Sequence, residues 1–318
     1  MRWVVTGGVG FIGFHLCRAI AARGDEIVVV DDFSDAPYPR AWKERNQRDL
    51  EEELGARITV KNACVTDRDA MRAAFEGASG VVHLAGLAGV RPSFRAPARY
   101  ARVNVEGTAT TLEVAREVGV KRYLFASSSS VYGNSTPLPA REDAPAVMPE
   151  SPYAATKRGA ELVAAAIAKI ATELPITALR FFTVYGPRQR PEMAITLFMN
   201  AVLRGEPITM FGDGSMRRDF THVDDIVRGI ASAMEKAPAG FRAYNLGSGA
   251  PIRLDALVEA IGKAADKTPN VKRDAVPPGD VDATFADIGR ARDELGYAPR
   301  VALVDGLATV RAWVSRSV

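Results

Sequence analysis

Short apolar runs alternate with amphipathic segments through the first half of the chain. The apolar runs are predicted strands at residues 3–5, 27–30, 58–60, 81–84, 123–126 and 176–182. The amphipathic segments have helical spacing and lie at residues 11–22, 67–75, 104–118 and 151–170. Uniformly apolar strands separated by helices are typical of a parallel sheet that is covered on both faces. The pattern therefore predicts the α/β fold class with a doubly wound parallel sheet.

The pattern loosens after about residue 186, where glycines and prolines punctuate shorter elements. This change predicts a smaller, loop-rich C-terminal substrate domain. We expect residues 1–185, together with about 220–248, to form the first domain. Residues 186–219 and 249–318 would then form the second. The charged stretch at 42–53 is interpreted as a solvated helix.

Composition excludes several classes of protein. The 318 residues, 47% hydrophobic and 25% charged, can bury a full core. The 41 basic and 38 acidic residues give a net charge of only +3, so nucleic-acid binding is not expected. The sequence has no run of about 18 apolar residues, so no membrane span is predicted. Cys17 and Cys64 match neither metal nor disulfide spacing, so we expect two reduced thiols, no metal and a soluble, cytoplasmic protein.

A glycine-rich turn follows the first predicted strand. The stretch TGGVGFIG at 6–13 places Gly7, Gly10 and Gly13 between this strand and a helix. Such glycines permit a tight turn, approach of the backbone to a pyrophosphate, and close packing of helix on strand. Asp31, 18 residues after Gly13, ends the second strand and can bind the adenosine ribose. Together these features predict a Rossmann dinucleotide site, and Asp31 with Asp32 favours NAD over NADP because both carboxylates repel a 2′-phosphate.

A tyrosine and a lysine share one face of a predicted helix. The stretch SPYAATK at 151–157 begins this helix at Pro152 and places Tyr153 and Lys157 four residues apart. A phenol has a pKa near 10, but a neighbouring ammonium and a positive nicotinamide ring both favour the phenolate. The pair is therefore a candidate acid and base.

Four serines follow the strand at 123–126, within the stretch ASSSSVYG at 126–133. Ligands of a parallel sheet bind beyond the carboxyl ends of its strands. Apolar residues flank the run on both sides, which argues against a flexible linker. We therefore interpret the serines as part of an active site.

These features resemble the extended short-chain dehydrogenase/reductase family, in particular its NAD-dependent nucleotide-sugar epimerases and dehydratases. The resemblance covers essentially the whole chain. It includes HLAG at 83–86, NVEGT at 104–108, GDG at 212–214, RDFTHVDD at 218–225, YNLGSG at 244–249, PGD at 278–280 and ADIGRARDELGY at 286–297.

The resemblance implies a role for each member of a catalytic triad. Tyr153 would take the proton of a sugar hydroxyl as hydride leaves the same carbon for NAD, Ser128 would hold that oxygen, and Lys157 would bind the nicotinamide ribose. Besides Tyr153 and Lys157, the implied NAD contacts are Gly7, Gly10, Phe11, Ile12, Gly13, Asp31, Asp32, Val65, Leu84, Ala85 and Gly86.

Ser129 and Ser130 distinguish between the reactions that the family performs. The resembling dehydratases carry Asp-Glu at these two positions, and the sugar-nucleotide decarboxylases carry Glu at the second. Hydroxyls are expected if the enzyme only oxidises the sugar, lets the 4-keto sugar rotate in the site and returns hydride to the other face of the ketone. The resemblance therefore implies an isomerase that performs 4-epimerisation.

Two stretches, DDFSDAPYP at 31–39 and FFTVYGPRQRPEMA at 181–194, are similar to the UDP-glucuronate 4-epimerases. Hydroxyls from Ser129, Ser130 and Thr183, with Arg190 as counter-charge, would suit the C6 carboxylate of that sugar. Fixing this carboxylate would also keep the β-keto acid intermediate from losing CO2. A surface or phosphate-binding role for Arg190 remains an alternative.

The resemblance also assigns the UDP half of the substrate. Arg218 and Arg91 would bind the diphosphate, Asp280 the uridine ribose, and the backbone from Thr209 to Phe211 the uracil. Cys64 and Ala88 depart from the pattern of relatives, which place an acidic adenine contact and a cofactor-site lysine there. Pro277 replaces a residue that is often polar.

Three functions stay open from the sequence. The first is UDP-glucuronate 4-epimerase. The second is a UDP-glucose/UDP-galactose or N-acetylhexosamine 4-epimerase, and the third is a catalytically silent NAD-binding sensor on the same fold. The family also implies a homodimer that packs through the helices at 104–118 and 151–170.

Overall fold

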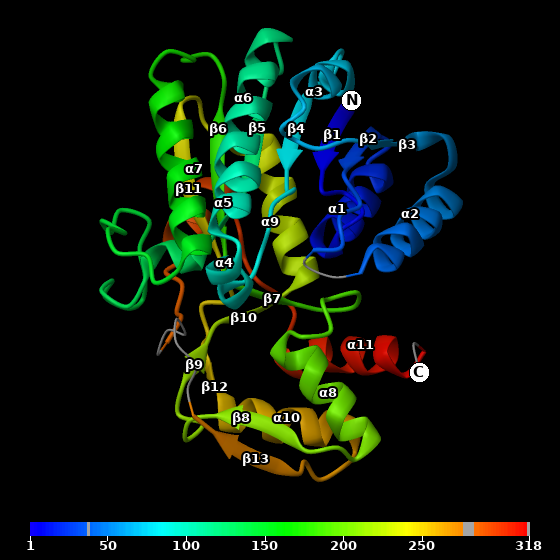
Figure 1. Ribbon diagram of the computed structural model, residues 1–318, viewed down its shortest axis with the longest axis vertical. Coiled ribbons are helices and arrows are strands. Elements are labelled where there is room, and N and C mark those ends of the chain that lie inside the picture. The colour runs from blue at the N-terminus through cyan, green and yellow to red at the C-terminus, as the bar shows by residue number, and fades with distance from the viewer. Residues whose placement is uncertain (37–38, 276–282, 317–318) are drawn as a thin grey trace.

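The structure is a computed structural model that describes residues 1–36, 39–275 and 283–316. A seven-stranded parallel sheet forms the upper part of the molecule as Figure 1 shows it. The strand order is β11-β6-β5-β4-β1-β2-β3, and every neighbouring pair is parallel. The strands are β1 (Arg2–Thr6), β2 (Glu26–Asp31), β3 (Ile58–Asn62), β4 (Gly80–His83), β5 (Tyr123–Ser128), β6 (Ile176–Phe181) and β11 (Phe241–Leu246). The six predicted strands are confirmed. The seventh, β11, extends the sheet beside β6.

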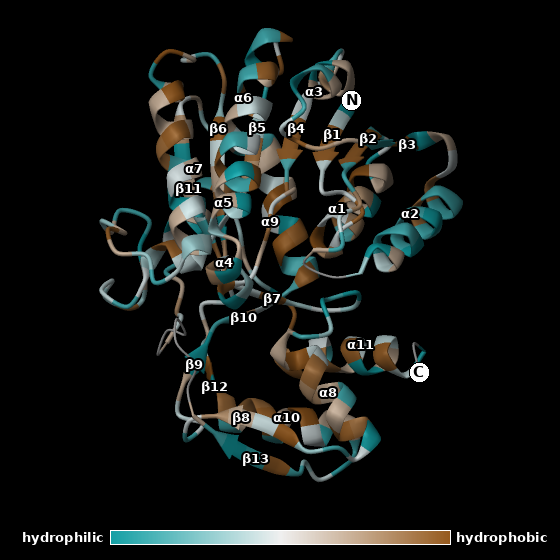
Figure 2. Ribbon diagram, viewed as in Figure 1, coloured by the Kyte–Doolittle hydropathy of each residue, from teal (hydrophilic) through white to brown (hydrophobic). Residues whose placement is uncertain are grey.

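Helices cover both faces of this sheet, as the uniformly apolar strands require. One face carries α1 (Phe11–Ala22), α2 (Arg40–Leu54) and α9 (Val223–Lys236). The other carries α3 (Arg68–Phe75), α6 (Gly107–Glu117) and α7 (Pro152–Ala168). Val5 and Val4, neighbours on β1, belong to the two different cores. Figure 2 shows the strands as a hydrophobic layer between the helices.

Local signals fix where the helix with the candidate acid and base begins. The hydroxyl of Ser151 accepts a hydrogen bond from the N–H of Ala154 at 3.2 Å, and Pro152 occupies the first turn of α7. Tyr153 and Lys157 are therefore held in the first two turns, close to the carboxyl ends of the strands.

The predicted helix at 104–118 differs from the observed one. The structure has α5 (Pro97–Ala101), a π-helical turn η2 (Arg102–Glu106) and then α6. A π turn accommodates an extra residue inside a helix and often occurs at functional sites. The π turn does not follow the hydrophobic repeat of an α-helix. The sequence pattern therefore placed the start of the helix too late.

A smaller layer lies below the sheet. Its core joins α8 (Ala194–Arg204), α10 (Leu254–Ala265) and α11 (Leu303–Ser315) with β8 (Ile208–Phe211). The exposed strand β13 (Val271–Asp274) pairs in parallel with β8. Two further short pairs are β7 (Thr183–Tyr185) with β10 (Phe220–His222) and β9 (Arg217–Arg218) with β12 (Ile252–Arg253). The remaining short helices are α4 (Val90–Arg95), η1 (Gly55–Arg57), η3 (Ser129–Tyr132) and the π turn η4 (Ala291–Leu295).

The charged stretch at 42–53 is helical, but the interpretation of α2 as a solvated helix is only half correct. Its inner face buries Lys43, Asn46 and Leu50. These positions lie three and four residues apart, so they form one stripe on the helix.

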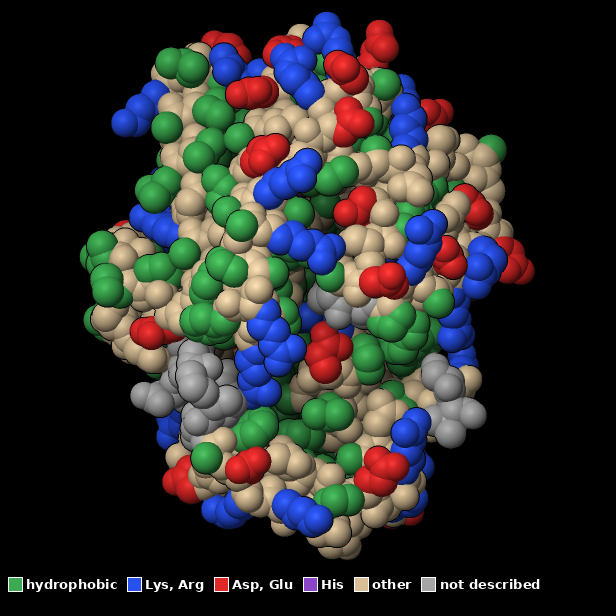
Figure 3. All heavy atoms as spheres, viewed as in Figure 1, with side chains coloured by type: hydrophobic (Ala, Val, Ile, Leu, Met, Phe, Trp, Pro, Cys, Tyr) green, Lys and Arg blue, Asp and Glu red, His purple; other side chains and the backbone are tan. Residues whose placement is uncertain are grey.

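The surface agrees with the small net charge. Figure 3 shows acidic and basic side chains interspersed over the visible face. Cys17 and Cys64 are both free thiols. Within the described part of the chain, no helix has both the length and the apolar character needed to cross a membrane.

Candidate active site

A cavity of about 720 Å³ lies between the carboxyl ends of the sheet strands and the smaller layer. It brings together the sequence-predicted site residues that the structure describes. From the expected cofactor end these are Gly7, Gly10, Phe11, Ile12, Gly13, Asp31, Asp32, Val65, Leu84, Ala85 and Gly86. From the expected sugar end they are Arg91, Ser128, Ser129, Ser130, Tyr153, Lys157, Thr183, Arg190, Thr209, Phe211 and Arg218. Asp280 and Pro277 lie outside the described residues.

The glycine turn leaves no room for side chains. Gly7 has a φ of 71°, and a Cβ there would lie 2.7 Å from the backbone nitrogen of Ala85. A Cβ on Gly13 would lie 2.3 Å from the carbonyl oxygen of Gly7. Gly10 is the N-cap of α1, and no side chain caps this helix. The bare backbone at a helix N-terminus fits the pyrophosphate of a dinucleotide.

Asp31 ends β2 and is nearly fully buried. One of its oxygens accepts hydrogen bonds from the N–H of Phe33 and from Nζ of Lys43, each at 3.0 Å. Lys43 also lies 3.7 Å from the carboxylate of Asp32. Burial raises the pKa of the Asp31 carboxyl group, although the charge and hydrogen bond of Lys43 oppose the rise. The residues fit an adenosine ribose, with one ammonium compensating part of the negative charge.

Lys43 is a cavity residue that the sequence analysis missed. Because α2 was interpreted as solvated, none of its residues was a candidate. The sequence did contain a signal that one face of α2 is buried. Residues 43, 46 and 50 lie on one helical face, and residue 50 is an apolar leucine.

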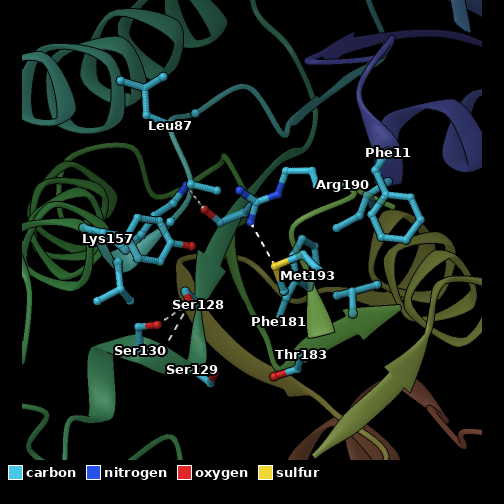
Figure 4. Close-up of a pocket in the computed structure, with 18 of the residues that line it drawn as sticks. Phe11, Leu87, Ser128, Ser129, Ser130, Lys157, Phe181, Thr183, Arg190 and Met193 are labelled. Atoms are coloured by element: carbon cyan, nitrogen blue, oxygen red, sulfur yellow. Dashed lines mark hydrogen bonds between the residues drawn. The ribbon is translucent and has the colours of Figure 1, made fainter. Parts of the chain in front are cut away.

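The candidate triad comes from two elements. Ser128 is the last residue of β5, whereas Tyr153 and Lys157 lie on α7. The hydroxyl of Ser128 donates to Oγ of Ser130 at 3.2 Å (Figure 4). Burial raises the pKa of the Tyr153 phenol, while a hydrogen bond with Ser128 and the charge of Arg190 lower it. The serine and the tyrosine are therefore close enough to share one substrate oxygen.

Lys157 is buried and lines the cavity. Its Nζ donates to the carbonyl of Ala126 at 2.9 Å. Burial lowers the pKa of its ammonium to about 8, and the negative charge of Glu161 works against this change. A Cβ on Gly86 would lie only 3.1 Å from Nζ, so the glycine of the HLAG motif keeps the space in front of the ammonium open. The ammonium can therefore donate to a ligand from this position.

Two further polar residues near the triad were not predicted. Asn104, in the π turn, exchanges hydrogen bonds with both backbone groups of Leu87 at 2.8 and 3.0 Å and donates to Thr156 at 3.0 Å. Tyr100 packs edge to face on Tyr153 with the ring centroids 6.3 Å apart. Asn104 lies inside the NVEGT motif, which was the available signal. Nothing in the sequence singled out Tyr100.

The expected sugar end is polar and carries one cation close to the triad. Ser129 and Ser130 follow β5 in η3, Thr183 begins β7, and Arg190 comes from the segment that leads into α8 (Figure 4). The guanidinium of Arg190 pairs with the carboxylate of Glu192 at 3.0 Å. Hydroxyls and a guanidinium can together bind a carboxylate.

The opposite wall comes from the smaller layer. The guanidinium of Arg91 lies 5.0 Å from the ring centroid of Phe211 on β8. Thr209 also lies on β8, and Arg218 lies on β9. Arg91, Arg218 and the backbone of β8 therefore lie where the part of a ligand farthest from the triad would extend.

Oxidation of an alcohol by a dinucleotide requires a base beside the nicotinamide and a donor that holds the alcohol oxygen. The cavity offers Tyr153 and Ser128 for these tasks at the carboxyl end of a Rossmann sheet. A tyrosine and a serine at this end of a Rossmann sheet are typical of the short-chain dehydrogenase/reductase class. The family model of the NAD dependent epimerase/dehydratase family matches residues 3–247, and the chain belongs to this family.

The similar proteins include UDP-glucuronate 4-epimerases. A UDP-glucuronate 4-epimerase of Thermodesulfobacterium geofontis is 35% identical over 319 residues, which cover 99% of this chain and 97% of the relative. The crystal structure of a UDP-glucuronic acid 4-epimerase from Bacillus cereus, in complex with UDP-glucuronic acid and NAD, matches with a TM-score of 0.93 at 33% identity. MoeE5 in complex with UDP-glucuronic acid and NAD matches with a TM-score of 0.88 at 36% identity. Both structural matches cover 100% of this chain and 100% of the other.

Proposed function

We propose that the protein is an NAD-dependent isomerase that converts UDP-glucuronate to UDP-galacturonate through a 4-keto intermediate. The observation that carries this proposal is the composition of the sugar end. Ser129, Ser130, Thr183 and Arg190 line the same cavity as Tyr153, and no carboxylic acid occupies positions 129 and 130. Relatives over the full length of the chain, named as UDP-glucuronate 4-epimerases, support the same conclusion.

Each member of the triad has one task in this reaction. Tyr153 accepts the proton of the C4 hydroxyl and later returns it. Ser128 donates to the C4 oxygen and keeps it beside the phenol. The positive charge of Lys157 favours the phenolate, and its ammonium donates to the nicotinamide ribose. NAD supplies the acceptor and the source of the hydride at C4.

The site also has to protect the intermediate. A 4-keto uronic acid is a β-keto acid, and it loses CO2 when the bond to its carboxylate lies parallel to the π system of the ketone. Donors from Ser129, Ser130 and Thr183, with the charge of Arg190, hold the carboxylate out of this alignment. The same contacts distinguish a uronic acid from a neutral hexose.

We further propose that the smaller layer, residues 186–219 and 249–318, binds the UDP half, and that residues 1–185 with about 220–248 bind NAD. Arg91 and Arg218 face the diphosphate, the backbone from Thr209 to Phe211 faces the uracil, and Asp280 binds the uridine ribose. The position of β8 and β9 in the wall of the cavity supports this division.

The test is product analysis. The NAD-loaded protein is incubated with UDP-glucuronate, UDP-glucose and UDP-N-acetylglucosamine separately, and the products are resolved by chromatography. The proposal expects UDP-galacturonate from the first substrate, and no turnover by a Tyr153→Phe variant. Turnover of UDP-glucose alone would favour the hexose 4-epimerase. A 4-keto-pentose product would indicate a decarboxylase instead, and NAD binding without turnover of any sugar would favour a sensor.

We also propose a cytoplasmic homodimer. Leu162 and Ile170, on α7 and just beyond it, are 55% and 72% exposed, so the helix that the family resemblance assigns to the interface carries apolar side chains that a partner could cover. Light scattering during gel filtration tests this proposal. A Leu162→Lys variant should be monomeric if α7 forms the interface.

A further inference from the structure

The segment between β7 and α8 begins with a turn that has an unusual third residue. The N–H of Gln189 donates to the carbonyl of Gly186 at 3.2 Å and closes the turn. Pro187 is its second residue, and Arg188, the third, has a φ of 69°. Glycine normally fills this position of a type II turn, because a side chain disfavours a positive φ. Arginine in this position is held by its surroundings.

The guanidinium of Arg188 is held between three helices of the two layers. Its carbon lies 3.8 Å from the ring centroid of Phe14 in α1 and 4.7 Å from that of Trp313 in α11. It also donates to Asn46 and pairs with Asp49, both on α2. A planar guanidinium can stack and form two hydrogen bonds at once, which a lysine cannot do.

The backbone of the turn has its own anchor. Nε2 of His15 lies 3.0 Å from the carbonyl oxygen of Pro187, so that nitrogen carries the proton and donates. Asn46, which accepts from Arg188, also donates to the carbonyl of Val9 in the glycine turn at 2.9 Å. One amide therefore contacts both the expected cofactor turn and the turn at Arg188.

The two residues after Arg188 extend toward the ligand cavity. Gln189 is buried, donates to the carbonyl of Val184 at 2.6 Å and accepts from Thr196 at 2.9 Å. Arg190 then lines the cavity, close enough to Tyr153 for its charge to lower the pKa of that phenol (Figure 4).

We propose that Arg188 is a positioning residue for substrate recognition: by fastening the turn at 186–189 to α1, α2 and α11, it directs Arg190 toward the sugar carboxylate. This inference rests on the proposed function, in which Arg190 meets the C6 carboxylate. Arg188 itself does not line the ligand cavity. Its loss should therefore weaken recognition of the carboxylate and leave recognition of the nucleotide intact.

The test compares binding and kinetics in four variants of the NAD-loaded protein. Arg188→Ala removes the side chain, Arg188→Gly removes it and relieves the backbone, and Arg188→Lys keeps the charge. The matched control is Arg45→Ala, because Arg45 also lies over the ring of Trp313, at 5.2 Å. Calorimetry measures the Kd for UDP-glucuronate, UDP-glucose and UDP, and product formation gives KM and kcat.

The expected result is a rise of about tenfold in the Kd and KM for UDP-glucuronate in Arg188→Ala and Arg188→Gly, with the Kd for UDP-glucose and UDP unchanged. The kcat should change less than about twofold, since the triad lies on β5 and α7. Arg188→Lys should recover part of the affinity, and Arg45→Ala should match the wild type.

Two outcomes would overturn the inference. One is an unchanged preference for UDP-glucuronate over UDP-glucose in both Arg188→Ala and Arg188→Gly. The other is an equal loss of affinity for all three ligands, which would indicate general loosening of the fold. Failure of the proposed function is distinguishable, because in that case the wild type itself would show no turnover of UDP-glucuronate.

Discussion

The hydroxyl of Ser127 donates to the carboxylate of Glu161 at 2.6 Å, in a part of the structure where both residues are almost completely buried. Arg180 on β6 donates to both oxygens of the same carboxylate, each at 2.8 Å. Glu161 follows Lys157 by one turn on α7, and Ser127 precedes Ser128 on β5. The Ser127–Glu161 hydrogen bond thus joins the strand and the helix that carry the triad, and Arg180 links β6 to the same carboxylate.

Removal of Glu161 should be strongly destabilising. Glu161→Ala leaves the charge of Arg180 buried without its anionic partner, and such changes cost about 3–5 kcal/mol. Urea unfolding of the NAD-free protein measures the free energy of unfolding. The double variant Glu161→Leu with Arg180→Met should lose less stability than Glu161→Ala, because it leaves no unpaired charge. A loss below about 1 kcal/mol in the single variant would contradict this account.

Lys157→Met should abolish turnover and yet stabilise the NAD-free protein at pH 7. Burial lowers the pKa of Lys157 from 10.5 to about 8, so the native state binds its proton less tightly than the unfolded state does. The buried ammonium therefore costs stability below pH 8, by at most about 3 kcal/mol. As the pH rises from about 8 to 10.5, this cost is relieved and the wild type should approach the variant.

Urea unfolding at pH 7 and pH 10 checks this prediction. The free energies of unfolding of Lys157→Met and the wild type should differ more at pH 7. Equal stability at pH 7 would show that the ammonium is well solvated in the native state.

Thr183→Val should weaken binding of UDP-glucuronate and increase its decarboxylation. The substitution removes one hydroxyl from the sugar end while nearly keeping the volume of the side chain. A lost hydrogen bond to a charged group raises KM about tenfold or more. The fraction of product released as CO2 should also rise, which can be measured with substrate labelled at C6. Thr59→Val, at an exposed position of β3, is the control and should match the wild type. An unchanged ratio of CO2 to epimer would remove Thr183 from the carboxylate site.

Glu192→Gln should tighten binding of UDP-glucuronate. The carboxylate of Glu192 holds Arg190 at 3.0 Å and therefore competes with the sugar carboxylate for the same guanidinium. Without this negative charge, KM for UDP-glucuronate should fall by about two- to fivefold, in the range expected for an exposed ion pair. The Kd for UDP-glucose should not change. Glu150→Gln, which removes another carboxylate at the cavity wall, is the matched control. A higher KM would mean that Glu192 orients Arg190 and does not compete with the substrate.

The sequence predicted most of the sheet and the centre of the site because both depend on local spacing. Gly7 and Gly13 each have a position that no side chain can share, and Tyr153 and Lys157 need only one helical face. The serines could be placed because a parallel sheet brings the carboxyl ends of its strands to one edge.

The missed residues depend on contacts that spacing does not encode. Lys43 lies in a charged stretch that is typical of an exposed helix, and only its contact with Asp31 distinguishes it. Asn104 occupies a π turn, which interrupts helical periodicity. Arg188 has a left-handed backbone conformation that sequence rules assign to glycine. In each case the tertiary structure overrides the local preference.

The cavity has walls of separate origin. Strand ends that carry Asp31 and Ser128 form one, and β8 and β9 form the other. If the second wall binds the UDP half, as proposed, mutations at Thr209 or Arg218 alter which nucleotide is accepted while proton and hydride transfer stay as they are. Selection can act on each wall independently, and a protein engineer seeking a substrate with a different nucleotide should begin with the second wall and leave the first intact.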